Sequence, residues 1–377
     1  MKKILYLALN IKNGYGISAK AIIDTLTKIK DIELDVVYLN DPAFRNQKIA
    51  DSYDIAINHT APNNLVNDWN SNGYLKMAMS RAKKRYQYVL WETNSLPSPL
   101  ASFFSSDAIT GFICPSHFTE ELVRHFRKEI HYIPITQDDI SYHPDKRAKN
   151  SPTFNVLTVA QLSVRKAIDV SVCAFVNAFK DIPNKVKYYI KIGEKLDNTD
   201  INQLIKGNIA RSLLPNHGNI YVIDRFMAEN ELENLYLNSH CYLHLSRGEG
   251  FGMTPLTAIN YGLPVVYSDW SAHTEFLKRD KKSLPVDGRL DFAHSMNPSF
   301  GFEAGMLWYE CNVKDAADKL RNMYDAWVAH KLKFNAPEIV NDYKEDAILN
   351  NIAGLIGVKN VEFKMVNKVG ELNLIEV

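Results

Sequence analysis

Residues 241–267 read CYLHLSRGEGFGMTPLTAINYGLPVVY, in which two apolar runs enclose a glycine-rich segment. The first and last runs, Cys241–Leu245 and Pro264–Tyr267, have the length and composition of buried strands. Between them, Thr254 is a suitable N-cap and Pro255 a suitable first residue for a helix. The pattern predicts a strand, a glycine loop, a helix and a second strand, which is the repeating unit of an open α/β sheet.

The same alternation of short apolar runs and amphipathic helical segments continues along most of the chain. A polar segment with two prolines interrupts it at residues 143–152, where we place a linker. We therefore predict an α/β protein with two Rossmann-like domains, residues 1–147 and 148–335. A C-terminal helix and tail, residues 336–377, should pack back on the first domain. Strands of the first domain are predicted at Lys3–Leu9, Asp35–Leu39, Asp54–Asn58, Tyr88–Trp91, Gly111–Pro115 and His131–Ile133.

Composition and charge are those of an ordinary globular protein. Hydrophobic residues make up 46%, and 44 lysines and arginines balance 43 acidic residues, so the net charge is +1. This balance favours neither a nucleic-acid nor a membrane partner. No apolar run reaches the roughly 18 residues of a membrane span, and the short run after Lys3 fits a first strand better than a secretory signal. The four cysteines are far apart and should be reduced thiols. We expect a cytoplasmic protein, with peripheral membrane contact left open.

Two loops of the second domain leave a strand and enter a helix, so both are candidates for binding phosphate. In Gly250–Thr254, glycines let the backbone approach a ligand, and the N–H groups at the helix start attract anions. In residues 160–166, the adjacent cations Arg165 and Lys166 suit a phosphate group. The alternative for each loop taken alone is a tight turn or a solvated basic turn without a ligand. Their occurrence in one domain favours a diphosphate site.

A third glycine loop follows the first predicted strand, at residues 12–18. Its glycines are Gly14 and Gly16, but Ala19 occupies the third glycine position of a GxGxxG fingerprint. A dinucleotide-binding dehydrogenase is therefore weakly supported. We expect Gly14 and Gly16 to lie on the donor side of a cleft between the domains.

Several segments resemble those of a large glycosyltransferase family, family 4 or the group 1 type. Residues 249–264 are similar to its EGFGxPxxEAxAxGxPV segment, residues 160–167 to its GRLxxxKG loop and residues 133–144 to its IPNGVDxxxFxP motif. Segments 91–97 and 114–118 also resemble a subgroup of these enzymes. The resemblance extends to about residue 330 and implies the GT-B fold, in which two Rossmann-like domains face an interdomain cleft. It further implies a retaining hexosyl- or pentosyltransferase that uses a nucleotide-diphosphate sugar, with a UDP-sugar favoured.

The resemblance also implies roles for individual residues of the second domain. Arg165 and Lys166 would contact the donor diphosphate and Glu249 the transferred sugar, so these three form the expected catalytic set. The loop backbone would line the sugar and the phosphates through Gly250, Phe251, Gly252, Met253 and Thr254.

Three positions depart from the family pattern. The second glutamate, which usually holds the nucleotide ribose, is Thr257, and Glu275 is another carboxylate near a strand end that would substitute for it. The loop arginine is Gln161, and the glycine after the lysine is Ala167. We place Gln161, Thr257 and Glu275 among the donor-binding residues, and we leave the identity of the nucleotide open.

The expected mechanism needs no metal and no cofactor besides the donor. Breaking a sugar–phosphate bond builds negative charge on the leaving diphosphate, which preorganised cations and helix N–H groups stabilise. No Asp-x-Asp motif follows a predicted strand, and His, Cys, Asp and Glu do not group at metal-ligand spacings. We therefore expect metal-independent transfer, with front-face retention as the family implies.

On the acceptor side, three polar residues follow predicted strands of the first domain, where ligands of α/β proteins bind. They are His59, Glu92 and His117, of which Glu92 is the best candidate for binding or deprotonating an acceptor hydroxyl. The alternative for each is a hydrogen-bonded residue at the rim of the site.

The acceptor expected by default is a saccharide or a glycolipid. The rival is a hydroxymethylated base in DNA, as in phage DNA-modifying glycosyltransferases, because two basic clusters lie in the acceptor half. The alternative for these clusters is two solvated helix faces, which the neutral net charge favours. A non-catalytic sugar-nucleotide-binding protein is a third hypothesis, since Thr257 replaces a family glutamate. The candidate DNA phosphate contacts are Lys83, Lys84, Arg85, Arg127 and Lys128.

Overall fold

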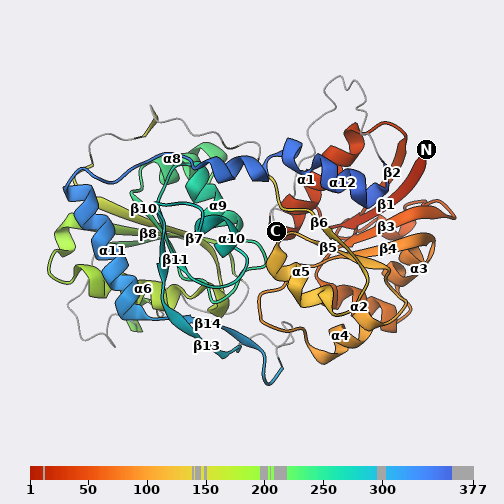
Figure 1. Ribbon diagram of the computed structural model, residues 1–377, viewed down its shortest axis with the longest axis horizontal. Helices are drawn as coiled ribbons and strands as arrows, with labels where there is room; N and C mark the ends of the chain where they lie inside the picture. Colours follow the sequence, from red (N-terminus) through yellow and green to blue (C-terminus); the bar gives the residue numbers. More distant parts are fainter. Residues whose placement is uncertain are drawn as a thin grey trace. The chain divides into compact units, whose positions relative to one another are not determined.

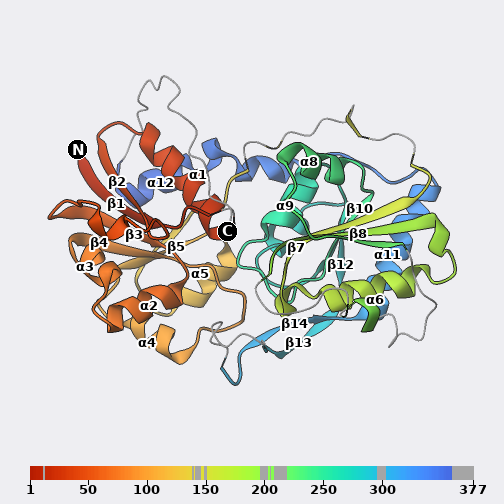
Figure 2. The same ribbon diagram turned by 180° about the vertical axis from the view of Figure 1, so that it is seen from behind.

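The computed structural model describes residues 1–11, 13–137, 140, 146–147, 151–195, 203, 205–207, 219–294 and 303–358, apart from the side chains of residues 194 and 195. The chain divides into two compact units. Unit 1 comprises Met1–Trp91, Ser95–Asp138 and Asn341–Val377, and unit 2 comprises Glu92–Asn94 and Asp139–Val340. Each unit contains a six-stranded parallel sheet covered by helices (Figures 1 and 2). The predicted pair of Rossmann-like sheets is therefore confirmed.

Unit 1 has the strand order β2-β1-β3-β4-β5-β6. Its strands are β1 (Lys2–Ala8), β2 (Ile32–Tyr38), β3 (Tyr53–His59), β4 (Ala82–Tyr88), β5 (Gly111–Cys114) and β6 (Glu129–Tyr132). Its helices are α1 (Gly14–Lys28), α2 (Pro62–Asn70), α3 (Tyr74–Ser80), α4 (Ser98–Ser105), α5 (His117–Arg124) and α12 (Glu345–Ile356), with the short 3-10 turn η1 (Phe44–Asn46). Another 3-10 turn, η6 (Glu338–Tyr343), precedes α12. Figure 1 shows α1 and α12 together on one face of this sheet and α2, α3 and α4 on the other.

The core of unit 1 includes the C-terminal helix. Strand residues Ile4–Ala8 are completely buried, as a strand covered on both faces requires. Helix α12 packs against α1, where Glu345 accepts hydrogen bonds from Lys28 at 2.6 Å and from Thr25 at 3.0 Å. Its apolar residues Ile348 and Ile352 join the core formed by α1 and the sheet. The predicted tail from residue 359 onward lies outside the described residues.

Strand β4 (Ala82–Tyr88) corrects the prediction of a strand at Tyr88–Trp91. Residues 83–85 are three consecutive cations, and charged residues are depleted in strands, so the sequence pattern does not predict a strand there. The strand forms because Tyr86 and Tyr88 are fully buried and because β3 and β6 of the same sheet supply carboxylates. Tertiary contacts thus override the local propensity, and the first basic cluster lies on a strand rather than on a helix face.

Unit 2 has the strand order β12-β11-β10-β7-β8-β9. Its strands are β7 (Phe154–Leu162), β8 (Val186–Lys195), β9 (Ile220–Ile223), β10 (Cys241–His244), β11 (Val265–Ser268) and β12 (Leu284–Val286). Its helices are α6 (Ile168–Phe179), α8 (Glu229–Leu237), α9 (Met253–Asn260), α10 (Thr274–Leu277) and α11 (Val313–Val328), with 3-10 turns η3 (Val164–Lys166) and η4 (Pro183–Lys185). An antiparallel hairpin of β13 (Gly288–Phe292) and β14 (Leu307–Cys311) completes the unit. Helices α6 and α11 pack on one face of the sheet and α8 and α9 on the other (Figures 1 and 2).

The strand order of unit 2 reverses at β7, since β8 lies on one side of it and β10 on the other. Backbone pairing between β7 and β10 is limited to two residue pairs, Val156 with Cys241 and Leu157 with Tyr242. Beyond them, side chains replace the backbone ladder: Thr158 donates to the Leu243 carbonyl at 2.7 Å. The two strands therefore separate at their carboxyl ends, which is where open α/β sheets bind ligands.

None of the described helices is both long and apolar enough to cross a membrane. All four cysteines are free thiols, with Cys114, Cys241 and Cys311 buried and Cys173 half-buried. Burial raises the pKa of Cys241 to about 12, so this thiol is not a nucleophile at neutral pH.

Candidate active site

The glycine loop between β10 and α9 turns into the helix at Gly252. This residue is the N-cap and has φ +101, and an added Cβ would lie 2.7 Å from the Cβ of His273. Only glycine suits both the left-handed backbone and the close approach. The predicted helix start, with Thr254 as N-cap and Pro255 as first residue, is therefore wrong by two residues. Thr254 lies in the first turn, where its side chain hydrogen-bonds the buried Tyr242 hydroxyl.

The backbone around Glu249 is fixed from both sides. A Cβ on Gly248 would lie 2.0 Å from the Glu92 carbonyl oxygen, so this position also requires glycine. The Glu249 N–H donates to the Ser271 hydroxyl at 2.9 Å. Ser271 itself has φ +70, a left-handed conformation that costs a non-glycine residue of order 1 kcal/mol or more. The strained conformation places the Ser271 hydroxyl where it accepts the hydrogen bond from the glycine loop.

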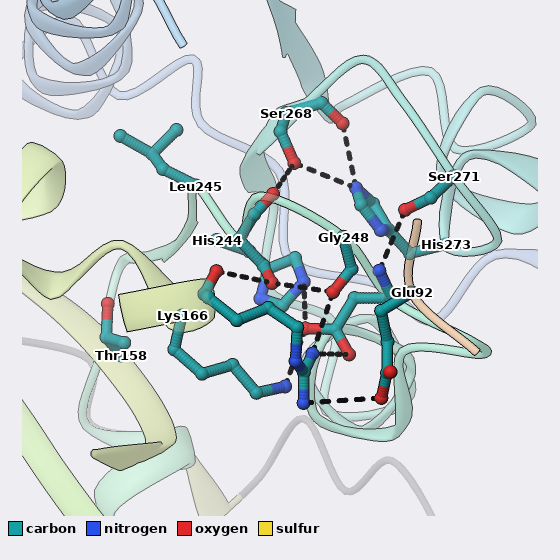
Figure 3. Close-up of polar contacts among 12 residues, drawn as sticks. Glu92, Thr158, Lys166, His244, Leu245, Gly248, Ser268, Ser271 and His273 are labelled. Carbon is teal, nitrogen blue, oxygen red and sulfur yellow. Dashed lines mark hydrogen bonds and ion pairs between the residues drawn. The ribbon is translucent and has the colours of Figure 1, made fainter. Parts of the chain in front are cut away.

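Three cationic or imidazole groups surround the Glu249 carboxylate. Lys166 Nζ lies 2.6 Å from Oε1 and Arg165 Nη1 lies 3.2 Å from Oε2. His244 Nε2 lies 3.4 Å from Oε1. The side chains are nearly enclosed, with exposed fractions of 8% for Glu249 and 12% for Lys166. Figure 3 shows Lys166 and His244 converging on this point. The structure thus brings together Arg165, Lys166 and Glu249, as the resemblance implies.

The charge state of this cluster follows from burial and pairing. Burial alone would raise the pKa of Glu249, but the charges of Lys166 and Arg165 outweigh it and hold that pKa well below the usual range. Burial lowers the pKa of Lys166, which Glu249 opposes. Burial likewise lowers the pKa of His244 far below its ordinary value and that of His273 to about 4. At neutral pH, a carboxylate therefore faces cations and neutral imidazoles.

Arg247 holds the loop that carries the two cations, although the sequence patterns did not single it out. Its guanidinium donates to Glu310 of β14 at 2.5 and 3.0 Å and to Asp169 of α6 at 3.1 and 3.2 Å. A further hydrogen bond reaches the Val164 carbonyl in turn η3. Its own N–H donates to the Arg165 carbonyl at 2.7 Å. One buried side chain thus connects η3, α6 and the hairpin, which fixes the direction in which the cations point.

His273 and Ser268, which the sequence patterns did not reveal, form hydrogen bonds next to the glycine loop. His273 Nε2 lies 2.7 Å from the Ser268 carbonyl, and the Ser268 hydroxyl donates to the Ser246 carbonyl at 2.7 Å (Figure 3). The rings of His244 and His273 meet edge to face at 4.9 Å. The histidine pair is thereby held neutral and oriented next to Glu249. The only sequence signal for it was the position of each histidine at or just after a strand end.

Comparison with known proteins gives a family match in unit 2 and solved structures of similar fold. Residues 139–291 match the sequence profile of the family described as glycosyl transferases group 1. The matched segment lies within unit 2 and includes Arg165, Lys166 and Glu249. The structure is similar to HepE from Anabaena, solved with UDP and glucose, with TM-score 0.64, 14% identity and coverage of 95% of this chain and 100% of that one. It is also similar to sucrose-phosphate synthase from Thermosynechococcus elongatus, with TM-score 0.65, 13% identity and coverage of 94% and 98%. The fold is GT-B.

Sequence similarity to curated proteins is confined to part of the chain. Over 172 residues the chain is 29% identical to the GtfA subunit of UDP-N-acetylglucosamine–peptide N-acetylglucosaminyltransferase from Streptococcus agalactiae. The match covers 44% of this chain and 32% of that relative. The chain therefore spans about a third of the length of the curated relatives it matches.

Ala167 replaces the glycine of the group 1 family in the loop after Lys166. Its backbone has φ +48 and ψ 41, which is the left-handed conformation. Alanine in this region costs roughly 1–2 kcal/mol relative to glycine. The departure noted in the sequence therefore leaves the loop geometry intact and introduces local strain.

The remaining donor-side candidates of unit 2 lie on β7, α9 and α10. Gln161 occupies an irregularity of β7, where the pairing with β8 shifts between Ala160 and Leu162. The Thr257 hydroxyl donates to the Met253 carbonyl at 3.0 Å within α9. Glu275 is half-buried in α10. Ligand contacts of these three residues stay predictions.

The glycine loop of unit 1 has a structural explanation. Asn13 is the N-cap of α1, and its side chain accepts from the N–H groups of Tyr15 at 3.1 Å and Gly16 at 3.2 Å. A Cβ on Gly16 would lie 1.9 Å from the Ile11 carbonyl oxygen, so the glycine permits close packing of the chain on itself. Gly14 is the first residue of the helix. The cap uses two of the N–H groups that a phosphate would need, which favours a structural role for this loop.

His59 is enclosed in unit 1. Its ring nitrogens lie 2.6 Å from the Tyr6 hydroxyl and 2.8 Å from the Ser18 hydroxyl, and its ring stacks on Tyr88 at 3.6 Å. The residue is 0% exposed, and burial lowers its pKa to about 3. This geometry corrects the expectation of a residue that reaches an acceptor, because both nitrogens are occupied and no surface faces solvent.

Glu92 and His117 differ from the expectation in other ways. Glu92 belongs to unit 2, where its carboxylate lies 3.6 Å from Arg165, so it accompanies the donor loops. His117 begins α5 and is 64% exposed, with Nδ1 2.9 Å from Glu120. Its ring stacks on Tyr132 at 4.4 Å. Of the three acceptor-side candidates, His117 alone has an open face in unit 1.

The first basic cluster of unit 1 is compensated by the protein itself. Lys83 lies 2.8 Å from Asp54, and Lys84 lies 2.9 Å from Glu129. Arg85 donates to the carbonyls of residues 107 and 108 at 2.8 Å each. These cations connect β4 to β3, to β6 and to the segment that precedes β5.

The two cations of the second basic cluster, Arg127 and Lys128, have different environments. Lys128 donates to the Ile109 carbonyl at 2.7 Å, so its charge is also satisfied within unit 1. Arg127 has φ +57 and forms the turn before β6. The contacts of the first cluster and of Lys128 favour surface and packing roles over contacts to DNA phosphates.

Proposed function

We propose that this chain transfers a sugar from a UDP-sugar to a hydroxyl acceptor, with retention of configuration and without a metal ion. The observation that carries the proposal is the buried Glu249 carboxylate between Lys166 and Arg165, at the carboxyl ends of β7 and β10. A buried carboxylate with two cations is costly to enclose. It lies at the point where the strand order reverses, which is where open α/β sheets bind ligands, so a role in ligand binding accounts for it.

The arrangement provides for both halves of a sugar diphosphate. The two cations and the first turn of α9 would receive the diphosphate, because helix N-termini and fixed cations stabilise anionic oxygens. Glu249 accepts hydrogen bonds only, so it would orient hydroxyl groups of the transferred sugar. As the sugar–phosphate bond breaks, negative charge grows on the leaving oxygen, and cations already in place stabilise it without reorganisation.

The nature of the donor rests on the relatives. HepE was solved with UDP and glucose, and the GtfA subunit is named for a UDP-N-acetylglucosamine donor. We therefore propose a UDP-hexose or UDP-N-acetylhexosamine as donor and a saccharide, glycolipid or peptide hydroxyl as acceptor. The compensated cations of unit 1 make DNA the less favoured acceptor.

A screen of UDP-, ADP- and GDP-sugars, read by release of the nucleoside diphosphate, tests the activity. Mass analysis of products formed with glycan, glycolipid and peptide acceptors then identifies the transfer. We expect Lys166→Ala to lower kcat by about 10²–10³-fold, with a smaller change in KM.

Lys282→Ala is the matched control for that variant. Lys282 also pairs with a buried carboxylate of unit 2, Asp280 at 2.7 Å, and its side chain has the same exposed fraction of 12%. Loss of turnover in both variants would indicate general destabilisation. Loss in Lys166→Ala alone supports the proposed role, and a rise in KM at unchanged kcat would contradict it.

A further inference from the structure

Glu92 has a fixed place in unit 2 although it lies far from the rest of that unit in sequence. Asn94, two residues on, donates from its N–H to the Leu307 carbonyl at 3.0 Å. The Leu307 N–H donates back to the Asn94 side-chain oxygen at 2.6 Å. On the other side, the Glu92 carbonyl fits against Gly248 so closely that no Cβ has room there. The segment is therefore held by Asn94 and by the fit of the Glu92 backbone, independently of the Glu92 carboxylate.

The Glu92 carboxylate faces Arg165. Its Oε1 lies 3.6 Å from Arg165 Nη2, while Nη1 of the same guanidinium contacts Glu249 at 3.2 Å and the Gly248 carbonyl at 2.7 Å. Arg165 thus lies between two carboxylates, one buried and one 28% exposed (Figure 3). The cluster of Arg165, Lys166, Glu249 and Glu92 contains two cations and two anions, so its formal charges cancel.

We propose that Glu92 is a counter-charge that sets the affinity of this site for a nucleoside diphosphate. The inference rests on the proposed function, in which Arg165 and Lys166 receive the diphosphate. The Glu92 carboxylate occupies one edge of the Arg165 guanidinium and repels the incoming anion. It weakens binding of the nucleoside diphosphate product and so favours its release, while the buried Glu249 keeps the cations aligned.

The alternative, that Glu92 serves only to stabilise the fold, accounts poorly for its position. At 3.6 Å the ion pair is long and its carboxylate is 28% exposed, so it contributes little to stability. The backbone contacts to Leu307 and Gly248 already fix the segment. A multiply charged ligand beside the same carboxylate, in contrast, experiences the repulsion once for each of its charges.

Calorimetric titration of the full chain with UDP and with inorganic pyrophosphate at low ionic strength tests the proposal. We expect Glu92→Gln to bind both probes on the order of tenfold more tightly than wild type. Glu92→Asp keeps the charge and should bind within about threefold of wild type. The gain in Glu92→Gln should shrink at high salt, because the repulsion is screened.

Glu233→Gln is the matched control. Glu233 lies in unit 2, pairs with Lys146 at 3.1 Å and is 29% exposed, so the variant makes the same change in net charge from a similar environment. Its affinity should stay near that of wild type, which separates a local effect from a change in overall charge. In turnover assays, UDP should inhibit Glu92→Gln at lower concentrations than it inhibits wild type.

Each outcome decides between the inference and the function on which it rests. Unchanged or weaker binding in Glu92→Gln, with wild type still binding UDP, would overturn the counter-charge and leave the proposed function standing. Equal gains in Glu92→Gln and Glu233→Gln would also overturn it, since the effect would then be global. If neither probe binds to wild type or to Glu92→Gln, both the diphosphate site and the counter-charge are wrong.

Discussion

The pairing of Lys166 with Glu249 makes a quantitative prediction for stability that is independent of catalysis. Lys166→Met removes one cation from a carboxylate whose side chain is 8% exposed. Breaking a buried ion pair by removing one partner costs about 3–5 kcal/mol, because the remaining charge is uncompensated. Arg165 still lies 3.2 Å from the other oxygen, so we expect the lower end of this range, roughly 3 kcal/mol.

The double variant Lys166→Met/Glu249→Gln should recover most of this loss. It replaces the ion pair by neutral groups of similar shape, a change that is often close to neutral for stability. We expect it to lie within about 1 kcal/mol of wild type, which corresponds to a coupling energy of at least roughly 2 kcal/mol between the two positions. It should nevertheless remain inactive, because both groups assigned to the donor are gone.

Native-state hydrogen exchange of the amides in β7 and α9 is the suitable measurement, because it reports on unit 2 itself. A single global unfolding transition is not assured in a chain of two units. The variants Lys282→Met and Asp280→Asn, alone and combined, provide the matched cycle at a buried pair outside the cluster. The stability loss of Lys166→Met should shrink as pH falls, because protonation of Glu249 removes the uncompensated charge. Additive effects of the two substitutions, within about 0.5 kcal/mol, would refute the coupling.

Four further outcomes are expected. Ala167→Gly should leave the free energy of unfolding nearly unchanged. It relieves about 1–2 kcal/mol of left-handed backbone strain, which offsets the loss of a buried methyl group and the added entropy of the unfolded chain. Ala174→Gly, in the fully buried interior of α6, should instead cost about 2 kcal/mol in the same unfolding assay. Burial lowers the pKa of His273 to about 4, so as pH falls from about 6.5 to 4 this histidine is protonated in the unfolded chain but not in the folded one. The free energy of unfolding therefore falls across that window by up to about 1.4 kcal/mol per pH unit. His273→Gln should remove this part of the pH dependence. Arg247→Lys should lower kcat about tenfold or more by displacing η3, whereas Arg321→Lys, which alters a bidentate surface pair with an aspartate, should not. Transferase activity should survive EDTA, and a full, metal-reversible loss would contradict the proposed mechanism.

The fold and the central site could be predicted because both depend on local signals. Buried parallel strands leave continuous apolar runs, and glycine loops mark the points where strands enter helices. The carboxyl ends of parallel strands meet at one edge, so Arg165, Lys166 and Glu249 had to converge once their loops were recognised. The motif also located Gly252, although the helix begins two residues before the expected cap, because a glycine at φ +101 ends the loop earlier than a threonine would.

The errors arose where tertiary contacts decide the outcome. Strand β4 carries three consecutive cations, and only the carboxylates at 54 and 129 make that sequence acceptable in a sheet. His59 has the position of a site residue, yet Tyr6 and Ser18 enclose both of its nitrogens. In each case the partners are distant in sequence, so no periodicity could reveal them.

Glu92 shows most clearly why a residue's chemistry and its position must be read together. From the sequence, a carboxylate after a strand of the first domain is a candidate base for an acceptor hydroxyl. The contacts of its backbone with Gly248, and of Asn94 with Leu307, instead attach this segment to unit 2. A glycine next to a glutamate with a proposed role in sugar binding is readily attributed to the approach of a ligand. Here the atom that excludes a side chain at 248 is the carbonyl oxygen of Glu92, so this glycine is required for the chain to bring a second carboxylate to Arg165.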